Sequence, residues 1–140
     1  MSVSAERRVE LAREGIEAYD AGDLETALAR FSPEIEVYSP PGTVNVGTYH
    51  GLEGFLKWTQ LWDEAWERFD REVEDTEAIG ERHVVAIVRH RGVGRGSGVA
   101  VEQLSGYVFD LDPDERCVYF ALYNEPDEAF AAAREREGIA

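Results

Sequence analysis

The apolar residues of this 140-residue chain change their spacing about half-way along it, and this change constrains the fold more than any other feature. Up to about residue 69 the spacing is that of helices, interrupted by one short alternating stretch. Beyond residue 72, apolar and polar residues alternate in segments separated by turn residues, which is typical of antiparallel strands. Helices followed by a run of strands predict an α+β domain with its helices gathered on one face of a curved sheet.

The first half of the chain is predicted to hold three helices and one short strand. Gly22-Asp23 stops the first helix and caps the second, and Pro40-Pro41-Gly42 ends the strand. The third helix follows a loop containing His50-Gly51, and its wide apolar surface indicates that it is covered on more than one side. In chain order the predicted elements span Ser4–Tyr19, Leu24–Phe31, Glu34–Tyr38 (the strand) and Leu52–Phe69.

The second half is predicted to form a meander of strands and a last helix. The glycines from Gly92 to Gly98 are typical of a hairpin end, and Asp112-Pro113-Asp114-Glu115 is typical of a turn. Pro126 opens the last helix, whose first turn carries acidic residues that suit the helix dipole. The predicted strands span Glu72–Ala78, Arg82–Arg91, Val99–Leu111 and Cys117–Tyr123.

This order of elements predicts an internal pocket. A concave sheet roofed by the long third helix leaves a cavity that is open at one end, and such cavities hold small ligands. We therefore expect residues 1–140 to form one domain with one pocket.

The charge of the chain excludes two classes of partner. Its 29 acidic and 14 basic residues give a formal net charge of −15, which disfavours contact with nucleic-acid phosphates and with anionic membrane surfaces. No apolar run reaches the roughly 18–20 residues of a membrane span, and the N-terminus lacks the apolar stretch of a signal peptide. The single cysteine, Cys117, suits the cytosol. We expect a cytoplasmic protein that binds neither nucleic acid nor membrane.

No metal or cofactor is expected from the sequence. His50, His83 and His90 lie on different predicted elements, and neither His-x-x-x-His nor Cys-x-x-Cys spacing occurs. Cys117 has no neighbouring histidine or lysine to lower its pKa, so it is not expected to act as a nucleophile.

Four short phrases of the sequence, in the same order, resemble SnoaL-like domains of the nuclear transport factor 2-like superfamily. They are Tyr19–Leu28 with Phe31, Gly51–Phe55, Arg95–Val99, and Tyr123 to Phe130. The resemblance covers nearly the whole chain. It implies an α+β cone, in which a curved sheet carries three main helices on its concave face around a cavity, plus a short C-terminal helix. The superfamily includes ketosteroid isomerases, polyketide cyclases, epoxide hydrolases, dehydratases and non-catalytic binding modules, so the fold does not determine the function.

The chain departs from the isomerases at the positions that carry their chemistry. It has Gly15 where the resemblance places a donor tyrosine, and Ser39 before Pro40 where it places the aspartate base. Tyr107 lies where the isomerases have a protonated aspartate, so one donor is retained and the base is not. Isomerisation by that mechanism is therefore not expected. Arg89 would correspond to the arginine of the epoxide hydrolases, but no pair of strand aspartates accompanies it.

Tyr107 and Arg89 are the candidate catalytic residues. A hairpin that turns near Gly94 to Ser97 puts Tyr107 opposite a residue near Val85, so that Arg89, Gln103 and Tyr107 share one face. There Tyr107 could donate a hydrogen bond to a ligand oxygen, and Arg89 could hold an anion. A shift of one residue in the register would send Arg89 to the other face. The alternatives are a surface ion pair for Arg89 and a packing role for Tyr107.

Aromatic side chains are the other candidates for contact with a ligand. Trp58, Trp62 and Trp66 are spaced four residues apart on the third predicted helix, which suits either a ligand-binding wall or a plain core. Tyr19 and Tyr38 could point into the cavity mouth, or could pack with their hydroxyls in water. The predicted ligand-binding residues are Tyr19, Tyr38, Trp58, Trp62 and Gln103.

Two functions remain open from the sequence. The first is a protein that binds a small, largely apolar or cyclic molecule and acts on it by acid/base chemistry of the isomerase, cyclase or hydrolase type. The second is a non-catalytic binding or dimerisation module whose cavity is filled by aromatic side chains. A homodimer is also expected, because Val84, Ala86 and Val88 alternate with Val85 and Ile87, and an apolar outer face must be covered.

Overall fold

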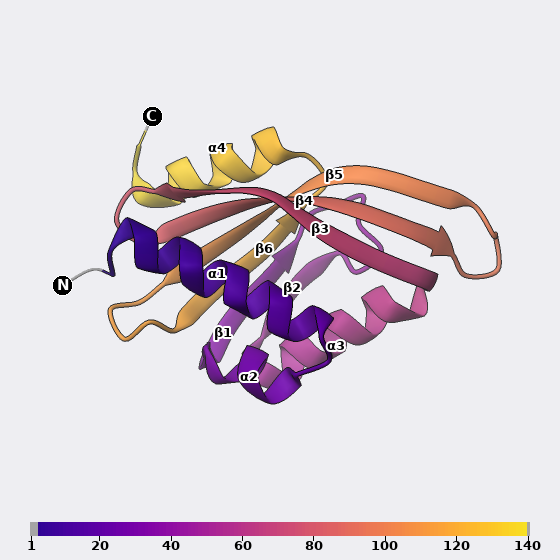
Figure 1. Ribbon diagram of the computed structural model, residues 1–140, viewed down its shortest axis with the longest axis horizontal. Helices are drawn as coiled ribbons and strands as arrows, with labels where there is room; N and C mark the ends of the chain where they lie inside the picture. The colour runs from indigo at the N-terminus through magenta and orange to yellow at the C-terminus, as the bar shows by residue number, and fades with distance from the viewer. Residues whose placement is uncertain (1–2, 140) are drawn as a thin grey trace.

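A six-stranded mixed sheet and four helices form the protein in the computed structural model, which describes residues 3–139 (Figure 1). The strand order is β2-β1-β6-β5-β4-β3, and β1 pairs with β6 in parallel while the other neighbours are antiparallel. The predicted α+β class is confirmed. The elements are α1 (Ala5–Asp20), α2 (Leu24–Ala29), β1 (Phe31–Ser39), β2 (Gly47–His50), α3 (Gly51–Glu64), β3 (Trp66–Ile79), β4 (His83–Gly94), β5 (Ala100–Leu111), β6 (Cys117–Tyr123) and α4 (Pro126–Glu137).

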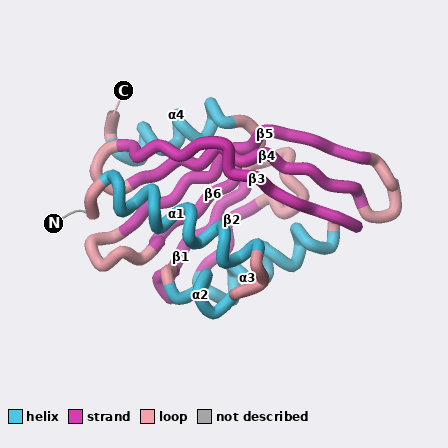
Figure 2. Tube along the Cα trace, viewed as in Figure 1, coloured by secondary structure: helices cyan, strands magenta, loops and turns pink. Residues whose placement is uncertain are grey.

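The helices cover both faces of the sheet unequally. Helices α1, α2 and α3 lie on its inner face, and α4 crosses the outer face (Figure 2). The main core lies on the inner side, where α1 and α3 pack on the inward side chains of all the long strands. A smaller core joins α4 to the outer face, where Ala129 and Ala133 are fully buried. Gly106 permits this close approach, because a Cβ there would lie 2.5 Å from the Ala129 Cβ.

The end of α4 is anchored by a network of polar side chains. The Glu137 carboxylate accepts hydrogen bonds from the backbone N–H groups of Glu81, Arg82 and His83 at the β3–β4 turn. It also lies 2.5 Å from Nδ1 of the His83 ring. Gly80 leaves room for this carboxylate, since a Cβ at Gly80 would lie 2.3 Å from Glu137. The C-terminal helix is therefore held at a defined position on the sheet.

The third helix ends earlier than predicted. Helix α3 stops at Glu64, and the predicted helical residues Trp66 and Phe69 belong to β3 instead. Arg95 holds this junction, because its side chain donates to the Glu64 and Trp66 carbonyls at 3.1 and 2.9 Å. The Trp66 ring lies on Gly92, where no side chain opposes it. These contacts come from the far end of β4 and are invisible to a helical spacing pattern, which Trp58, Trp62 and Trp66 satisfy equally well.

The first strand also begins earlier than predicted. Phe31, expected at the end of the second helix, is the first residue of β1, and α2 ends at Ala29. Pro33 lies within β1, where the pairing with β6 is irregular between Phe31 and Glu36, so its missing N–H breaks no regular ladder. Strand β2, which had been expected to be a loop, pairs with the second half of β1.

The register of β4 against β5 differs by one residue from the expected one. Tyr107 pairs with Ala86, and Val85 pairs with Val108. Tyr107 therefore shares the inner face with Ala86, Val88 and His90, while Val85, Ile87 and Arg89 face outward. The number of residues in the β4–β5 turn sets this register, and the glycine-rich sequence there is compatible with turns of more than one length.

None of the helices in residues 3–139 combines the length and the apolar character that crossing a membrane requires.

Candidate ligand-binding cavity

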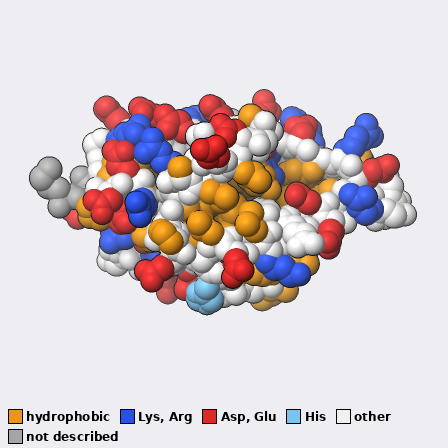
Figure 3. Space-filling model, turned by 90° about the horizontal axis from the view of Figure 1, so that it is seen from below, with side chains coloured by type: hydrophobic (Ala, Val, Ile, Leu, Met, Phe, Trp, Pro, Cys, Tyr) orange, Lys and Arg blue, Asp and Glu red, His pale blue; other side chains and the backbone are white. Residues whose placement is uncertain are grey.

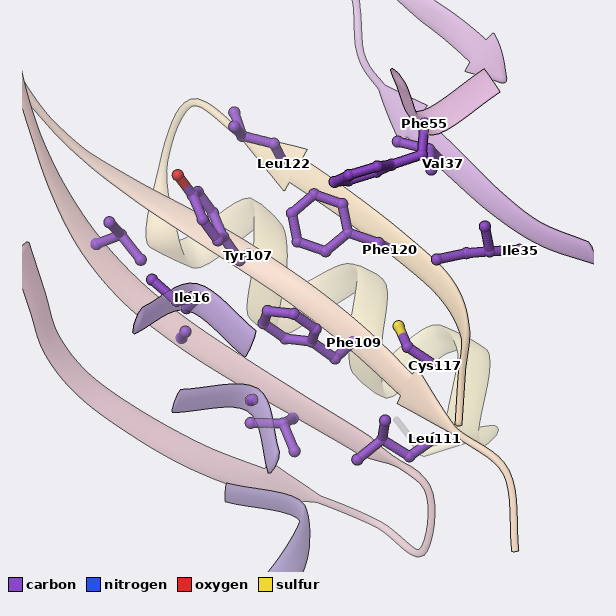
Figure 4. Close-up of a cluster of buried hydrophobic side chains, with 14 of the residues drawn as sticks. Ile16, Ile35, Val37, Phe55, Tyr107, Phe109, Leu111, Cys117, Phe120 and Leu122 are labelled. Atoms are coloured by element: carbon purple, nitrogen blue, oxygen red, sulfur yellow. The ribbon is translucent and has the colours of Figure 1, made fainter. Parts of the chain in front are cut away.

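A cavity lies where α1, α2 and α3 meet the inner face of the sheet. The space that a water-sized sphere can reach in it is about 50 Å³, within a wider recess of about 540 Å³ that includes the open mouth. This space has room for about three or four water molecules. Aromatic rings narrow it: Figure 4 shows Tyr107 and Phe120 projecting from neighbouring strands into one space, with Phe55 beside them. The lining residues are Gly15, Ile16, Tyr19, Ala27, Phe31, Phe55, Trp58, Thr59, Trp62, Arg71, Tyr107, Phe120 and Leu122.

Tyr107 is the best-supported polar group of the cavity. Its hydroxyl oxygen lies 2.7 Å from Nε2 of His90, whose Nδ1 lies 3.1 Å from Oγ of Ser105. Burial raises the pKa of Tyr107 to about 12, against the opposing charge of Arg71. Burial and the same charge lower the pKa of His90 to about 3. At neutral pH both groups are therefore uncharged, and they form a short hydrogen-bonded chain on the cavity wall.

Arg71 is the charged residue of this wall. It is the one Lys, Arg, Asp or Glu among the cavity-lining residues of the described chain. Its Nη1 donates to Oδ1 of Asp20 at 2.7 Å, and its guanidinium lies 5.2 Å from the ring centre of Tyr19 and 5.0 Å from that of Phe69. Burial raises the pKa of Asp20, and Arg71 opposes that change. The aromatic rings thus hold a cation at the cavity of a strongly acidic protein.

Two buried donors of the cavity have no acceptor within residues 3–139. They are Nε1 of Trp62 and Nε of Arg71. Trp62 is 8% exposed, and the Arg71 side chain is 11% exposed. A buried donor without a partner costs about 1–3 kcal/mol, so an acceptor that reached either group would stabilise the structure.

Four of the predicted site residues line the cavity: Tyr19, Trp58, Trp62 and Tyr107. Trp58 is held in place because its Nε1 donates to Oγ of the fully buried Ser39 at 2.7 Å. Ser39 stands where the resemblance placed a catalytic base, and here it serves the packing of a tryptophan.

Three predicted site residues lie away from the cavity. Arg89 is on the outer face, where it binds Glu74 at 2.9 Å and Glu102 at 3.4 Å, so the expected shared face with Tyr107 is wrong. Gln103 is paired with His90 on the inner side of β5, but it is exposed, and it donates to the Asn124 carbonyl. Tyr38 points outward beside Tyr123, because its neighbour Val37 occupies the inner face.

The sequence interpretation missed Arg71, His90 and Ser105. Arg71 fell between two predicted elements, yet Phe69, Arg71 and Val73 alternate as a strand does, and that spacing could have revealed it. His90 was considered as a metal ligand alone, and its contact with Tyr107 depends on the register. The part of the chain from residue 3 to 139 contains no group of three metal-ligating side chains. Burial raises the pKa of the Cys117 thiol to about 12, which suits the expectation that it is not a nucleophile.

Comparison with known proteins identifies relatives of this structure. A model of the SnoaL-like domain matches residues 12–120. No curated protein matches the sequence.

Three solved structures illustrate the likeness. An NTF2-like protein from Burkholderia thailandensis E264 has a TM-score of 0.76 at 19% identity, covering 94% of this chain and 98% of that one. A Mycobacterium tuberculosis protein in complex with estradiol-17beta-hemisuccinate has 0.69 at 14%, covering 86% and 95%. SalBIII, an epoxide hydrolase/cyclase-like enzyme in pyran ring formation in salinomycin, has 0.68 at 14%, covering 84% and 90%. At such identities the likeness establishes the NTF2-like fold alone.

Proposed function

This chain belongs to the SnoaL-like domain family, and on that premise we propose that it binds a small, largely apolar molecule in the cavity between α3 and the sheet. The observation that carries the proposal is the composition of the cavity wall. The wall is aromatic and aliphatic except where a few side chains contribute polar groups, namely Tyr19, Thr59, Trp62, Arg71 and Tyr107. An apolar pocket with a few convergent polar groups is the usual form of a small-molecule site.

The polar groups suggest how such a molecule is oriented. Its apolar body would lie against Phe55, Trp58 and Phe120, and an oxygen atom would face Tyr107 and Arg71. The complex of the Mycobacterium tuberculosis relative with a steroid derivative supports this class of ligand. In an acid/base reaction of the isomerase, cyclase or hydrolase type, Tyr107 would polarise the bound oxygen.

A second function is favoured by the small volume of the cavity. About 50 Å³ remains because Trp58, Trp62 and other rings occupy much of the cone, which is the arrangement expected of a non-catalytic module with a filled cavity. The two functions differ in one measurable way. If the cavity binds a ligand, a larger side chain placed in it should lower the affinity for that ligand. If the cavity is only a filled core, no ligand binds in the first place.

Gly15→Leu tests this difference. A Cβ at Gly15 meets no atom within 4 Å, and Gly15 lines the cavity, so the leucine enters open space. Because leucine also favours a helix by about 0.5–1 kcal/mol over glycine, stability should be retained. We expect the affinity for an apolar probe, 4-nitrotoluene, to fall at least about tenfold, as measured by tryptophan fluorescence quenching.

Glu17→Leu places the same side chain on the exposed face of α1 and serves as the control. It should leave binding of 4-nitrotoluene unchanged. If the wild-type protein does not bind the probe, or if Gly15→Leu binds it equally well, the proposed ligand-binding function is wrong.

A homodimer remains part of the proposal, with a smaller surface than the sequence indicated. Helix α4 packs on Val85 and Val108 and so covers part of the outer face of the sheet, the face that had been expected to contact a second copy. The outer face of β1 and β6, with half-buried Tyr38 and Tyr123, is left for a second copy. Sedimentation at micromolar concentration should show a dimer that Tyr38→Glu dissociates, and a wild-type monomer would contradict it.

A further inference from the structure

The hydrogen-bonded chain of Ser105, His90 and Tyr107 has two possible directions. All three side chains are buried, and none is more than 5% exposed, so bulk water does not supply alternative partners. A neutral imidazole carries one N–H and one bare nitrogen. The proton therefore lies either on Nδ1, facing Ser105, or on Nε2, facing Tyr107.

Ser105 decides between these directions. Within residues 3–139, His90 Nδ1 is the one hydrogen-bonding partner of the Ser105 hydroxyl. If Nδ1 carried the proton, the serine oxygen would accept it and the serine's own proton would be buried without an acceptor. With the proton on Nε2, Ser105 donates to His90 and His90 donates to the Tyr107 oxygen. The Tyr107 proton is then left to point into the cavity.

Two neighbouring polar groups of the lining can only donate a hydrogen bond, whereas the hydroxyls of Tyr19 and Thr59 can donate or accept. Nε1 of Trp62 and Nε of Arg71 are donors that cannot accept a hydrogen bond, and neither has a partner among the described residues. Both side chains line the same cavity as Tyr107. Three donors from Tyr107, Trp62 and Arg71 therefore line one cavity, and Arg71 brings a positive charge that the Asp20 carboxylate, 2.7 Å away, partly offsets. The complement to such a set is an oxygen that has lone pairs and no proton.

We infer that Ser105 and His90 are positioning residues that make the Tyr107 hydroxyl a donor toward the cavity, and that the cavity prefers apolar molecules ending in an ionised oxygen, such as a phenolate or an enolate. This inference rests on the proposed ligand-binding function for the identity of the ligand. The direction of the hydrogen bonds is a property of the protein alone. The two parts can therefore be tested separately.

The tautomer of His90 tests the direction without any ligand. A long-range ¹H–¹⁵N spectrum of the histidine side chains distinguishes a protonated Nε2 from a protonated Nδ1, and His90→Gln identifies the signal. We expect Nε2 to carry the proton, and a protonated Nδ1 would overturn the inference. Ser105→Ala should shift the equilibrium away from the Nε2–H form, whereas Ser97→Ala, which removes an exposed hydroxyl in the β4–β5 turn, should not. An unchanged tautomer in Ser105→Ala would show that Ser105 does not set the direction.

A pair of probes tests the preference for an ionised oxygen. The absorbance of 4-nitrophenol reports its ionisation, and 4-nitrotoluene has the same ring without the oxygen. We expect the ionised phenol to bind about tenfold more tightly than the neutral one, which lowers the apparent pKa of the bound phenol by about one unit. Ser105→Ala should reduce this shift while 4-nitrotoluene still binds, and Ser97→Ala should retain it.

The outcomes separate the two proposals. An unchanged or raised pKa of bound 4-nitrophenol overturns the inferred preference, even though binding of 4-nitrotoluene would support the proposed function. If neither probe binds, the proposed function and the ligand preference both fail, and the His90 tautomer alone decides the direction of the chain. Thermal unfolding of Ser105→Ala checks that the variant is folded, and the wild-type tautomer decides the direction even if it is not.

Discussion

The anchor of α4 and the wall of the cavity both contain polar groups in buried surroundings. The polar groups of the anchor have hydrogen-bonding partners, whereas some of those at the cavity have none. At the anchor, Glu137 accepts from three backbone N–H groups, and Asp110 binds Arg82 and Arg136 at 2.8 and 3.0 Å. At the cavity, Trp62 and Arg71 each retain a donor without an acceptor. Satisfied groups stabilise a fold, whereas unsatisfied groups lower its stability and are retained where something else binds.

The difference extends to the charges. Burial raises the pKa of Glu137, but its hydrogen bonds from His83 and the backbone outweigh this and lower the pKa to about 2. No comparable partner offsets burial at His90, whose pKa falls to about 3 so that it remains neutral. The α4 anchor therefore stabilises the charge of Glu137 through its partners, whereas burial at the cavity wall keeps the His90 ring uncharged. We expect substitutions at the anchor to change stability, and substitutions at the cavity wall to change binding.

The largest effect is expected from Glu137→Ala. The change leaves three backbone N–H groups and the His83 ring without their acceptor, and breaking a buried charged group of this kind costs about 3–5 kcal/mol. Urea unfolding measures the loss, and Glu135→Ala, on the exposed side of the same helix, is the control. Binding of 4-nitrotoluene by the folded fraction should not change. A loss below about 1 kcal/mol would remove the distinction between the two regions.

A smaller effect is expected from mild acid, between pH 6.5 and 4.5. The unfolded chain protonates His90 near its ordinary pKa of 6.5, while the folded protein holds it neutral down to about pH 3. The unfolded state binds more protons in this window, so stability falls as the pH falls, by at most about 1.4 kcal/mol for each pH unit. Glu137 adds to the loss below its ordinary pKa of 4.5, and its contribution is exhausted near pH 2.

His90→Gln separates these two contributions. It should flatten the dependence of the unfolding free energy between pH 6.5 and 4.5, where His90 dominates, and should leave the decline below pH 4.5. His50→Gln changes an exposed histidine and is the control that must retain the wild-type slope. If His90→Gln has the slope of the wild type, His90 is not held neutral by burial.

The smallest effect on stability is expected from Trp62→Phe. The substitution removes the unpartnered Nε1–H and keeps an aromatic ring against Phe69 and His90. Since the lost donor had no partner, stability should fall only through the smaller ring volume, by on the order of 1 kcal/mol. Affinity for ionised 4-nitrophenol should fall while affinity for 4-nitrotoluene is kept. A loss well above about 2 kcal/mol would exceed the cost of the smaller ring and would mean that this donor has an acceptor, such as ordered water.

The surface on the side of α2 and α3 also differs from the cavity in its charge. Hydrophobic side chains gather at the centre of that face and are surrounded by charged ones (Figure 3). Leu24 on α2 and Leu56 on α3 are both 43% exposed. The charged groups that give the chain its net charge of −15 thus lie mainly at the surface, while a single arginine lines the cavity.

The sequence by itself determined the class of the fold and most of its elements. Alternation in Val84–Val88 and the caps at Asp23 and Pro126 are local signals, because they depend on residues that are close along the chain. The resemblance of the four phrases pointed to the SnoaL-like domain, which the family match confirms. Tyr19, Trp58, Trp62 and Tyr107 were also identified, because their residue types and spacing suited a cavity wall.

Only the tertiary structure decided which polar groups meet. The register of β4 against β5 is set by a hairpin whose glycines permit more than one length, and a shift of one residue exchanged Arg89 for His90 beside Tyr107. The boundary between α3 and β3 was likewise decided by Arg95 and Gly92, which are far from Trp66 along the chain. A sequence pattern indicates the secondary structure that each segment prefers. Which residues of two strands lie opposite each other depends on how both strands pair, and that is decided only in the folded protein.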